Sequence, residues 1–562
     1  MYTMMIRGLQ RVGGVRRQRS HCFSSSSFSA SASASSSSVP NTDDIDFFDV
    51  TIVGGGVVGL SLANLLRREL PNLKVALIDS KKEPPSPLPS PTLSQPTTSS
   101  NDETTYQNEQ QQTTKRVPNP RSYALSPRSF KVLGSSIESK LSSSIGYYNS
   151  MQVWQDSSPA TLTFTTKDLD PDPNSNEASY LGGCCEDQTI VSTLWEDIMS
   201  SSKSPSNNTE LMINTTIESI NNIDGNDSNN LISVETNTNN GTTTTRKFNT
   251  AVLVGADGGN SFIRKSSGIS QIGPGSYNQN ALTFTVELEN NKMNKNGRAY
   301  QRYLSDGGPI ALLPTYSSNH AVIVWSTTQE VISKWKNSNK NKDDDDDEDL
   351  VQHLNDCLRE GPQRIPPLME GAFSKQSSSS TSASTDSNAF TNLIYGAERV
   401  LDTVHYGMAL AASQQPGEPI FQIPPKIISI ASQKFTFPLS CYQASTYVKN
   451  RVALVGDAAH TVHPMAGQGL NLGLADVDTL VTKLKKAHDA GMDLSSFLNE
   501  YNTDRHKNVS ISLTGIHALQ KLFVNTKDVP IQHVKTFGMN MIQNIGPLRR
   551  QLAIAAAYGV GV

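Results

Sequence analysis

The sequence predicts an α/β fold in which a parallel-sheet domain is assembled from separate pieces of the chain, a mixed or antiparallel β-sheet domain is inserted between those pieces, and the C-terminus is helical. Three observations predict this fold. A glycine-rich turn joins a strand to a helix near residue 54, and buried strands that end in Gly-Asp turns recur near residues 255 and 456. Between them, residues 281–327 form successive strand-like runs, at 281–287, 309–314 and 320–327.

The bulk composition excludes several classes of protein. The 562 residues carry a formal net charge of −4, which gives no reason to expect a nucleic-acid partner. No apolar run is long enough to span a bilayer, so any membrane contact is expected to be peripheral. The five cysteines are odd in number and form no CxxC, which disfavours a disulfide framework or a zinc site and favours a reducing compartment.

The N-terminal segment 1–42 has the composition of a mitochondrial targeting sequence. It contains clustered arginines and a long Ser/Ala tract, and the first acidic residue is Asp43. The alternative is a low-complexity tail without an address, since Ser-rich runs recur elsewhere in the chain. The arginines favour targeting.

Four compositionally biased segments interrupt the globular pattern and are expected to be disordered insertions. They are too poor in apolar residues to offset the entropy lost on ordering. The acidic run within the third could be an electrostatic docking site, although a solvated loop is favoured. The segments are 83–116, 201–248, 337–349 and 374–388.

The insertions and motifs together divide the chain into a first domain in three pieces and a second in two. The first domain is expected to cover 43–135, 181–267 and 435–490, and the second 136–180 and 268–434, followed by a helical region at 491–562.

The first motif predicts a dinucleotide site. A strand runs into Gly54-x-Gly56-x-x-Gly59 and then into an apolar-faced helix, and a second strand ends at Asp79, twenty residues after Gly59. The glycines allow a tight turn, close approach of a pyrophosphate and close packing of helix on strand, while the carboxylate is placed to accept hydrogen bonds from a ribose.

The second motif favours FAD over a nicotinamide cofactor. A buried strand ends at Gly456-Asp457, and a second glycine turn, Gly467-Gln468-Gly469, opens a helix that includes Asn471. A second turn far along the chain suits a long cofactor held at both ends. Asp457 can bind the ribityl chain, and amides near 467–471 can stabilise negative charge on a reduced flavin.

The third motif is a buried strand, 251–254, that ends in Gly255-Ala-Asp257 and is followed by Ser261 and Arg264. Asp257 could face the cofactor or could cap its own turn. His460 and His463 flank the second turn without spaced metal-ligand partners, so no metal site is expected.

Three strand-to-glycine turns in this order resemble the FAD-dependent aromatic hydroxylases, and the resemblance spans roughly residues 46–562. Further segments resemble the ubiquinone-biosynthesis subgroup, in particular its eukaryotic branch. In that subgroup the position of Arg121 approaches the flavin, so the resemblance implies that Arg121 contacts the cofactor. The segments are 463–477, 121–126, 308–314, 324–327, 437–439 and 547–550.

The resemblance implies a discontinuous FAD-binding Rossmann-like domain with an inserted substrate domain, and a monooxygenase reaction. It implies hydroxylation at ring carbon C5 of a polyprenylated hydroxybenzoate or phenol by a flavin C4a-hydroperoxide made from O2. No general base can be identified from the residues, and catalytic residues are not assigned.

The resemblance also implies a set of partners and a place in the cell. The expected electron donor is a matrix ferredoxin with its reductase, the expected associates are other ubiquinone-biosynthesis proteins, and the expected location is peripheral on the matrix side of the mitochondrial inner membrane. Two alternatives stay open: a flavin hydroxylase of another aromatic or isoprenoid substrate, and a non-catalytic subunit of a biosynthetic assembly.

The C-terminal region contains an apolar row at helical spacing that has two interpretations. It could pack against the body of the protein, or it could dock on a partner or a membrane. The row consists of Ile531, Val534, Phe537, Met541 and Ile545.

Overall fold

We describe the fold from a computed structural model of the chain. The glycine turns lie at the edge of a largely parallel sheet. The described residues from Ile45 onward form one compact unit. The targeting segment 1–42, the insertion 374–388 and nearly all of 83–116 fall outside the described residues. The structure describes residues 45–83, 86, 88, 116–156, 158–169, 180–202, 208–222, 231–239, 243–289, 297–304, 308–336, 345–362, 404, 421–463, 467–523 and 529–559.

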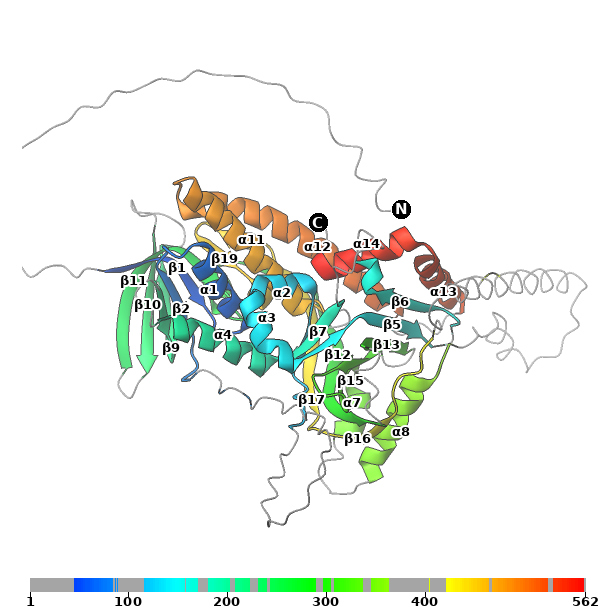
Figure 1. The fold of residues 1–562 in the computed structure, drawn as a ribbon. Coiled ribbons are helices and arrows are strands. Elements are labelled where there is room, and N and C mark those ends of the chain that lie inside the picture. Colours follow the sequence, from blue (N-terminus) through cyan, green and yellow to red (C-terminus); the bar gives the residue numbers. More distant parts are fainter. Residues whose placement is uncertain are drawn as a thin grey trace, which may run out of the picture. The chain divides into compact units, whose positions relative to one another are not determined.

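The first sheet has the strand order β18-β19-β11-β1-β2-β8, and β1 pairs in parallel with both β11 and β2. The helices α1 (Val57–Glu69) and α11 (Gly469–Asp489) pack against each other beside this sheet (Figure 1). The parallel sheet predicted from the motifs is therefore confirmed. Its strands are β1 (Asp46–Val53), β2 (Val75–Ile78), β8 (Thr209–Met212), β11 (Thr243–Gly255), β18 (Val448–Lys449) and β19 (Val452–Leu454).

The prediction of a disordered insertion at 201–248 is wrong for most of that segment. It contains β8, β9 (Thr215–Asn221), β10 (Ile232–Asn239) and the start of β11, which extend the first sheet. Threonine is β-branched and favours strands, and Ile232 and Val234 are buried. Apolar and polar residues alternate at the start of β10, and a count of residue types does not reveal that alternation.

The prediction for 337–349 is wrong at its acidic end. Residues 345–349 begin the helix α8 (Asp345–Arg359). Carboxylates at a helix N-terminus are stabilised by the helix dipole, and Asp347 also forms a 2.7 Å ion pair with Lys434. Residues 337–344 lie outside the described part.

A second, nine-stranded sheet is mixed, as predicted, because β5 and β13 pair in parallel while its other pairs are antiparallel. The three predicted strand runs correspond to β12, β14 and β15. A small third sheet has the order β3-β7-β4. The strands of the second sheet are β5 (Ser150–Gln155), β6 (Thr161–Thr165), β12 (Gln271–Leu288), β13 (Arg298–Leu304), β14 (Gly308–Pro314), β15 (His320–Thr328), β16 (Ile427–Ile430), β17 (Phe435–Ala444) and β20 (His460–Thr461), and those of the third are β3 (Ser122–Leu125), β4 (Ile145–Tyr148) and β7 (Gly182–Glu186).

Two large apolar clusters make up most of the core. One lies around the first sheet and includes Phe48 and Leu474, and the other lies on the second sheet and includes Trp154 and Phe284. The remaining helices are α2 (Pro127–Leu133), α3 (Ser135–Leu141), α4 (Asp187–Ser202), α5 (Phe262–Ser266), α7 (Gln329–Lys336), α12 (Leu498–Phe523), α13 (Val529–Asn544) and α14 (Gly546–Tyr558).

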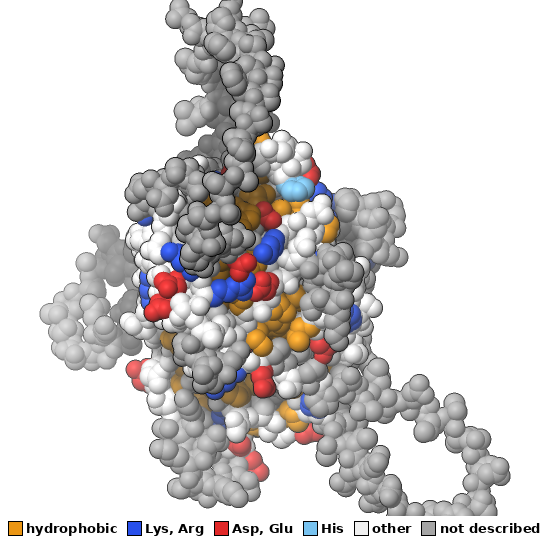
Figure 2. Space-filling model, turned by 90° about the vertical axis from the view of Figure 1, so that its left-hand side faces the viewer, with side chains coloured by type: hydrophobic (Ala, Val, Ile, Leu, Met, Phe, Trp, Pro, Cys, Tyr) orange, Lys and Arg blue, Asp and Glu red, His pale blue; other side chains and the backbone are white. Residues whose placement is uncertain are grey.

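The C-terminal region is helical, as predicted, and α13 packs on β6. Within the described residues, no helix is both long enough and apolar enough to cross a membrane. On the face drawn in Figure 2, acidic, basic and apolar side chains are mixed, so the described residues visible there form no block of positive charge.

We predict that Phe248→Ala lowers the free energy of unfolding by about 3–5 kcal/mol, because the ring is fully buried and its removal leaves a cavity. The Phe248 ring also packs edge-on against Phe48 at a centroid distance of 5.1 Å. Urea denaturation measures the change, with Phe435→Ala as the control because the Phe435 side chain is 49% exposed. Equal losses in the two variants would contradict the assignment of this core.

Candidate functional site

The register of the parallel strands brings all three predicted turns to one edge of the sheet. Val53 is paired with Gly255 and with Ile78, and Gly255 is paired with Leu454. Because parallel strands end at the same edge, the segments that follow them meet there. Two backbone hydrogen bonds tie them together, from the Ala256 amide to the Val53 carbonyl at 2.8 Å and from the Val455 amide to the Gly255 carbonyl at 3.0 Å.

The three glycines of the first turn, Gly54, Gly56 and Gly59, have the backbone geometry predicted for a tight turn, an open ligand site and a close helix–strand contact. Gly54 has φ +114°, a conformation that L side chains rarely adopt. A Cβ on Gly59 would stand 1.9 Å from the Gly54 carbonyl oxygen, so this glycine permits the contact of helix and strand. A Cβ on Gly56 would meet no protein atom within 4 Å, so the backbone there is open to a ligand.

Asp79 lies beside this turn, at the end of β2, and is 8% exposed. Its carboxylate accepts hydrogen bonds from the amides of Gly55 and Lys81. The structure therefore brings the predicted carboxylate to the glycine turn, where one side chain both holds the turn and adds negative charge next to the open backbone at Gly56.

The side chain of Asp257 caps the short helix α5. Its carboxylate accepts hydrogen bonds from the amides of Phe262 (2.6 Å) and Ile263 (3.1 Å) and from the Ser261 hydroxyl (2.6 Å). This is the capping geometry that the sequence left open as an alternative. A contact of Asp257 with the cofactor stays a prediction.

Asp457 follows β19 and shares its surroundings with residues of the third sheet. Its side chain is open to solvent, yet the surrounding protein raises the pKa of this carboxyl group, an effect that His460 opposes. Burial, together with the charges of Asp187 and Asp457, raises the pKa of Tyr123 to about 12. A contact of this exposed carboxyl group with a ligand hydroxyl stays a prediction.

A buried carboxylate, Asp476 on α11, holds the second turn in place. Its Oδ2 accepts a hydrogen bond from the Gly456 amide (2.9 Å) and lies 2.6 Å from His460 Nε2, while Oδ1 accepts one from Arg505 Nε (2.7 Å). Burial would raise the pKa of Asp476, but His460 and Arg505 outweigh it and hold that pKa below its usual value. Asp476 thus fixes the strand, its turn and two helices to one another.

Asn471 joins the second glycine turn to the segment that carries Arg121. Its Oδ1 accepts hydrogen bonds from the Ser126 amide (2.9 Å) and the Ser129 hydroxyl (2.6 Å), and its Nδ2 donates to the carbonyls of Ala124 (2.9 Å) and Gly467 (3.0 Å). With all of its polar groups used in this way, the Asn471 side chain positions the turn. Any contact with the cofactor would come from its backbone.

The remaining residues of the second turn lie at the start of α11. Gly467 has φ +60°, and Gln468, which precedes the helix, donates to the Ala556 carbonyl at 3.3 Å. The helix itself begins at Gly469. Its first amides are therefore directed toward the turn, where they can stabilise negative charge. Residues 464–466 lie outside the described part.

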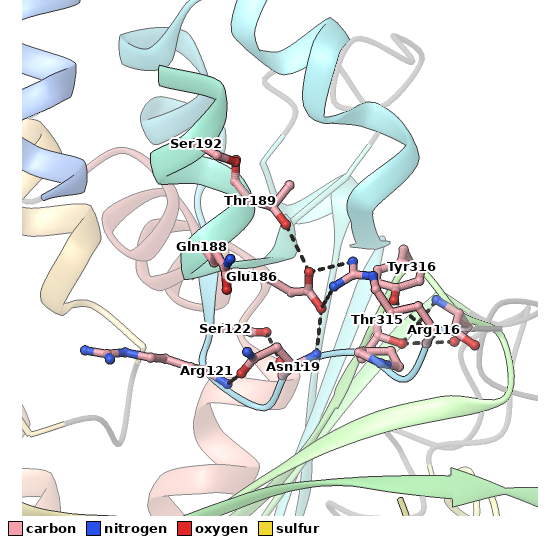
Figure 3. A network of polar contacts seen from close by, with 12 residues as sticks. Arg116, Asn119, Arg121, Ser122, Glu186, Gln188, Thr189, Ser192, Thr315 and Tyr316 are labelled. Atoms are coloured by element: carbon pink, nitrogen blue, oxygen red, sulfur yellow. Dashed lines mark hydrogen bonds and ion pairs between the residues drawn. The ribbon is translucent and has the colours of Figure 1, made fainter. Parts of the chain in front are cut away.

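The Arg121 side chain points away from a network of polar contacts that anchors the backbone before it (Figure 3). The anchor is Glu186, which forms a bidentate ion pair with Arg116 (2.7 and 3.1 Å) and accepts a hydrogen bond from the Asn119 amide (2.6 Å). The Arg121 side chain is 78% exposed and approaches Asp187 at 3.5 Å. The anchor fixes the backbone before Arg121. A contact of the exposed guanidinium with the cofactor stays a prediction.

The two histidines of the second motif have structural surroundings. His460 is bound to Asp476, and the His463 ring packs edge-on against Tyr277 at a centroid distance of 5.1 Å. Burial lowers the pKa of His463 to about 4, so this ring is neutral at neutral pH. In the described ranges, no group of three or more His, Cys, Asp or Glu residues is arranged to hold a metal ion.

The sequence reasoning missed the residues that position this site. Asp476, Arg505 and Glu186 were not singled out, although each is an almost fully buried charged residue. Asp476 carried a signal, because it falls between Leu472 and Leu480 on the buried side of α11. Its partner Arg505 gave no such signal, because the pairing depends on how α12 packs on α11.

A protein-family model described as "FAD binding domain" matches residues 112–371 and 424–512, which is more than half of the chain. The curated relatives include "Ubiquinone biosynthesis monooxygenase COQ6, mitochondrial" of Danio rerio, 27% identical over 92% of this chain and 91% of that protein. The relative of the same name in Saccharomyces cerevisiae is 31% identical over 54% of this chain and 58% of that protein.

Solved structures share the fold at low sequence identity. p-Nitrophenol 4-monooxygenase PnpA from Pseudomonas putida aligns with a TM-score of 0.56 and 14% identity over 92% of this chain and all of that chain. PqsL of P. aeruginosa aligns with a TM-score of 0.53 and 18% identity over 88% of this chain and all of that chain. These likenesses confirm the predicted fold class.

We predict that Gly56→Val abolishes flavin retention without disturbing the fold, because a Cβ on Gly56 meets no protein atom within 4 Å. Gly59→Val is the matched control and should lose stability itself, because its Cβ would overlap the Gly54 carbonyl oxygen. Flavin absorbance per protein after gel filtration measures retention, and thermal unfolding of the flavin-stripped proteins measures stability. A Gly56→Val protein with full flavin occupancy would contradict the role of Gly56. Asp457→Ala should also abolish flavin retention, and full occupancy in that variant would contradict the role of Asp457.

We predict that Asp476→Asn lowers the free energy of unfolding at neutral pH by about 3–5 kcal/mol, because Arg505 is left buried without its counter-charge. The pKa of Asp476 is lower in the folded than in the unfolded protein, so its contribution is present above about pH 4 and is lost as the pH falls further. The difference between wild type and variant should therefore shrink in acid.

Urea titrations across this pH range measure that difference. Asp504→Asn is the control, since Asp504 pairs with Lys483 at the surface and its side chain is 51% exposed. A difference between wild type and Asp476→Asn that stays constant with pH would contradict the role of a charged Asp476.

Proposed function

We propose a specific reaction for this chain, which belongs to the FAD binding domain family and is an FAD-dependent aromatic monooxygenase. The proposed reaction is hydroxylation of a polyprenylated hydroxybenzoate or phenol in ubiquinone biosynthesis. The observation that carries it is the meeting of three glycine turns at one sheet edge, in a chain that matches a ubiquinone-biosynthesis relative over 92% of its length.

The arrangement of the site fits FAD. The open backbone at Gly56 and the N-terminus of α1 would hold the pyrophosphate, and Asp79 would hold the adenosine ribose. Asp457 would hold the ribityl chain, and the first amides of α11 would lie at the flavin ring. Bound FAD supplies the activation of O2, and the chain's own residues position it and exclude water.

The finer proposals concern the substrate and the oxidant. We place hydroxylation at ring carbon C5, with a flavin C4a-hydroperoxide as the oxygen donor. One atom of O2 enters the ring and the other leaves as water, so each turnover consumes two electrons and two protons. The second sheet and the C-terminal helices would form the substrate-binding part, and the first sheet with its helices the FAD-binding part.

The proposed setting is peripheral, on the matrix side of the mitochondrial inner membrane, in a complex with other ubiquinone-biosynthesis proteins. The names of the relatives support the mitochondrial location and the pathway. The proposed electron donor is a ferredoxin with its reductase.

Loss of the gene tests the substrate assignment. Cells that lack the protein should accumulate a polyprenylated phenol one hydroxyl group short of the product, identified by mass spectrometry and by the position of the missing hydroxyl. Accumulation of an unrelated aromatic or isoprenoid compound would contradict the assignment. Purified protein without flavin absorbance would instead favour a non-catalytic subunit.

We predict that NADPH alone reduces the bound flavin slowly and that ferredoxin with its reductase restores rapid reduction. Within the sequence, one GxGxxG with its acidic partner is complete, and a second such unit for a nicotinamide cofactor is missing. Anaerobic stopped-flow at the flavin absorbance band measures both rates. Fast reduction by NADPH alone would contradict the ferredoxin proposal and leave the hydroxylase assignment intact.

A further inference from the structure

The helix α13 exposes a row of large apolar side chains. Val534 is 65% exposed, Phe537 49% and Met541 42%, and Ile545, directly after the helix, is 40% exposed. Their spacing of three or four residues places them on one face. Of the two interpretations of this row, packing against the body of the protein is wrong for these four residues. The side chain of Ile531 is outside the described part.

The opposite face of α13 is polar and buried, so the usual polarity of a surface helix is reversed. Thr536 is fully buried, and its hydroxyl lies 2.8 Å from that of Ser158. Gln543 accepts a hydrogen bond from the Thr163 amide at 2.8 Å. Burial also lowers the pKa of Lys535 to about 8. The other buried polar residues of this face are Gln532, His533 and Asn540.

These inner contacts anchor α13 to strand β6 and the loop before it, with Met539 as the buried apolar contact. The four residues of the outer row therefore keep 40–65% of their surface exposed instead of being buried in the core. The helices that α13 contacts, which are red to orange in Figure 1, also carry exposed apolar side chains, namely Leu519 and Leu522 on α12 and Leu552 on α14. A surface of this kind marks an interaction site.

The charge of the region indicates the chemistry of the partner. In the described part of residues 505–559, all Lys, Arg, Asp and Glu residues are basic. Arg505 and Lys535 are buried and Arg549 is paired with Asp168, so they do not supply free surface charge. Lys507 and Lys521 are exposed on α12. Apolar side chains at helical spacing beside cationic ones fit the boundary between the acyl chains and the headgroups of an anionic bilayer.

We propose that α13 docks on the surface of an anionic phospholipid bilayer, with Val534, Phe537, Met541 and Ile545 inserted among the headgroups and the exposed lysines of α12 at the phosphates. A second copy of the chain would bring the same positive charge against this face. The proposal deepens the peripheral membrane contact of the proposed function by naming the surface and the lipid chemistry, and it holds whichever aromatic ring is the substrate.

Flotation of the flavin-loaded full chain with lipid vesicles tests the proposal. Wild-type protein should float with vesicles that contain phosphatidylglycerol and far less with pure phosphatidylcholine, and added salt should weaken the binding. The double variant Phe537→Glu with Met541→Glu should lower the bound fraction roughly tenfold or more. Phe435→Glu, on β17, is the matched control, because Phe435 is also 49% exposed, and it should float like wild type.

Flavin absorbance and thermal unfolding show whether the double variant is folded. If it is not, Val534→Glu replaces it, since Val534 is the most exposed residue of the row. Undiminished vesicle binding by the folded variants would overturn the proposal. The proposal would also be overturned if wild-type protein failed to float but formed a dimer, or a complex with another protein, and the variants lost that association. This face would then be a protein interface. Aromatic hydroxylation is measured separately in detergent, so that failure of the membrane proposal and failure of the proposed function can be distinguished.

Discussion

The geometry of the site depends on the contacts that the buried carboxylate of Asp476 makes. This carboxylate holds the Gly456 amide, His460 and Arg505 together, so that a strand end, the turn after it and the helices α11 and α12 have fixed positions. Such a group is costly to bury unless each of its bonds is made, and removing a partner therefore affects all the others. The same helix carries Asn471 five residues earlier, which ties in the segment of Arg121. One helix thus aligns the two parts of the chain expected to meet at the flavin.

Much of the fold could be predicted because local pattern and tertiary structure agree in this chain. The strands before Gly54, Gly255 and Gly456 are short apolar runs bounded by glycine, and each lies in the sheet as expected. Composition was misleading at 201–248, where threonine-rich strands extend the sheet, and at 345–349, where an acidic run begins a helix. In both cases, tertiary contacts that a count of polar residues does not reveal offset the ordering entropy.

The residues expected at the cofactor proved easier to predict than the residues that hold them in place. Gly56 and Gly59 follow from what a turn and a pyrophosphate require. Glu186 and Arg505 follow from pairings between segments separated by tens of residues, which leave no periodic trace in the sequence. The apolar row on α13 could be recognised from its spacing in the sequence. That the row faces outward could be seen only in the structure, because the same spacing is typical of a helix packed on a core.

Transfer of an oxygen atom from O2 to an aromatic ring is the central claim, and isotopic labelling tests it most directly. The flavin-loaded protein is reduced, mixed with a polyprenylated hydroxybenzoate or phenol, and exposed to oxygen-18 gas. The product is then analysed by mass spectrometry. We expect one labelled oxygen atom per product molecule, on the ring. Release of hydrogen peroxide with no labelled product, or label that comes from water, would contradict the account.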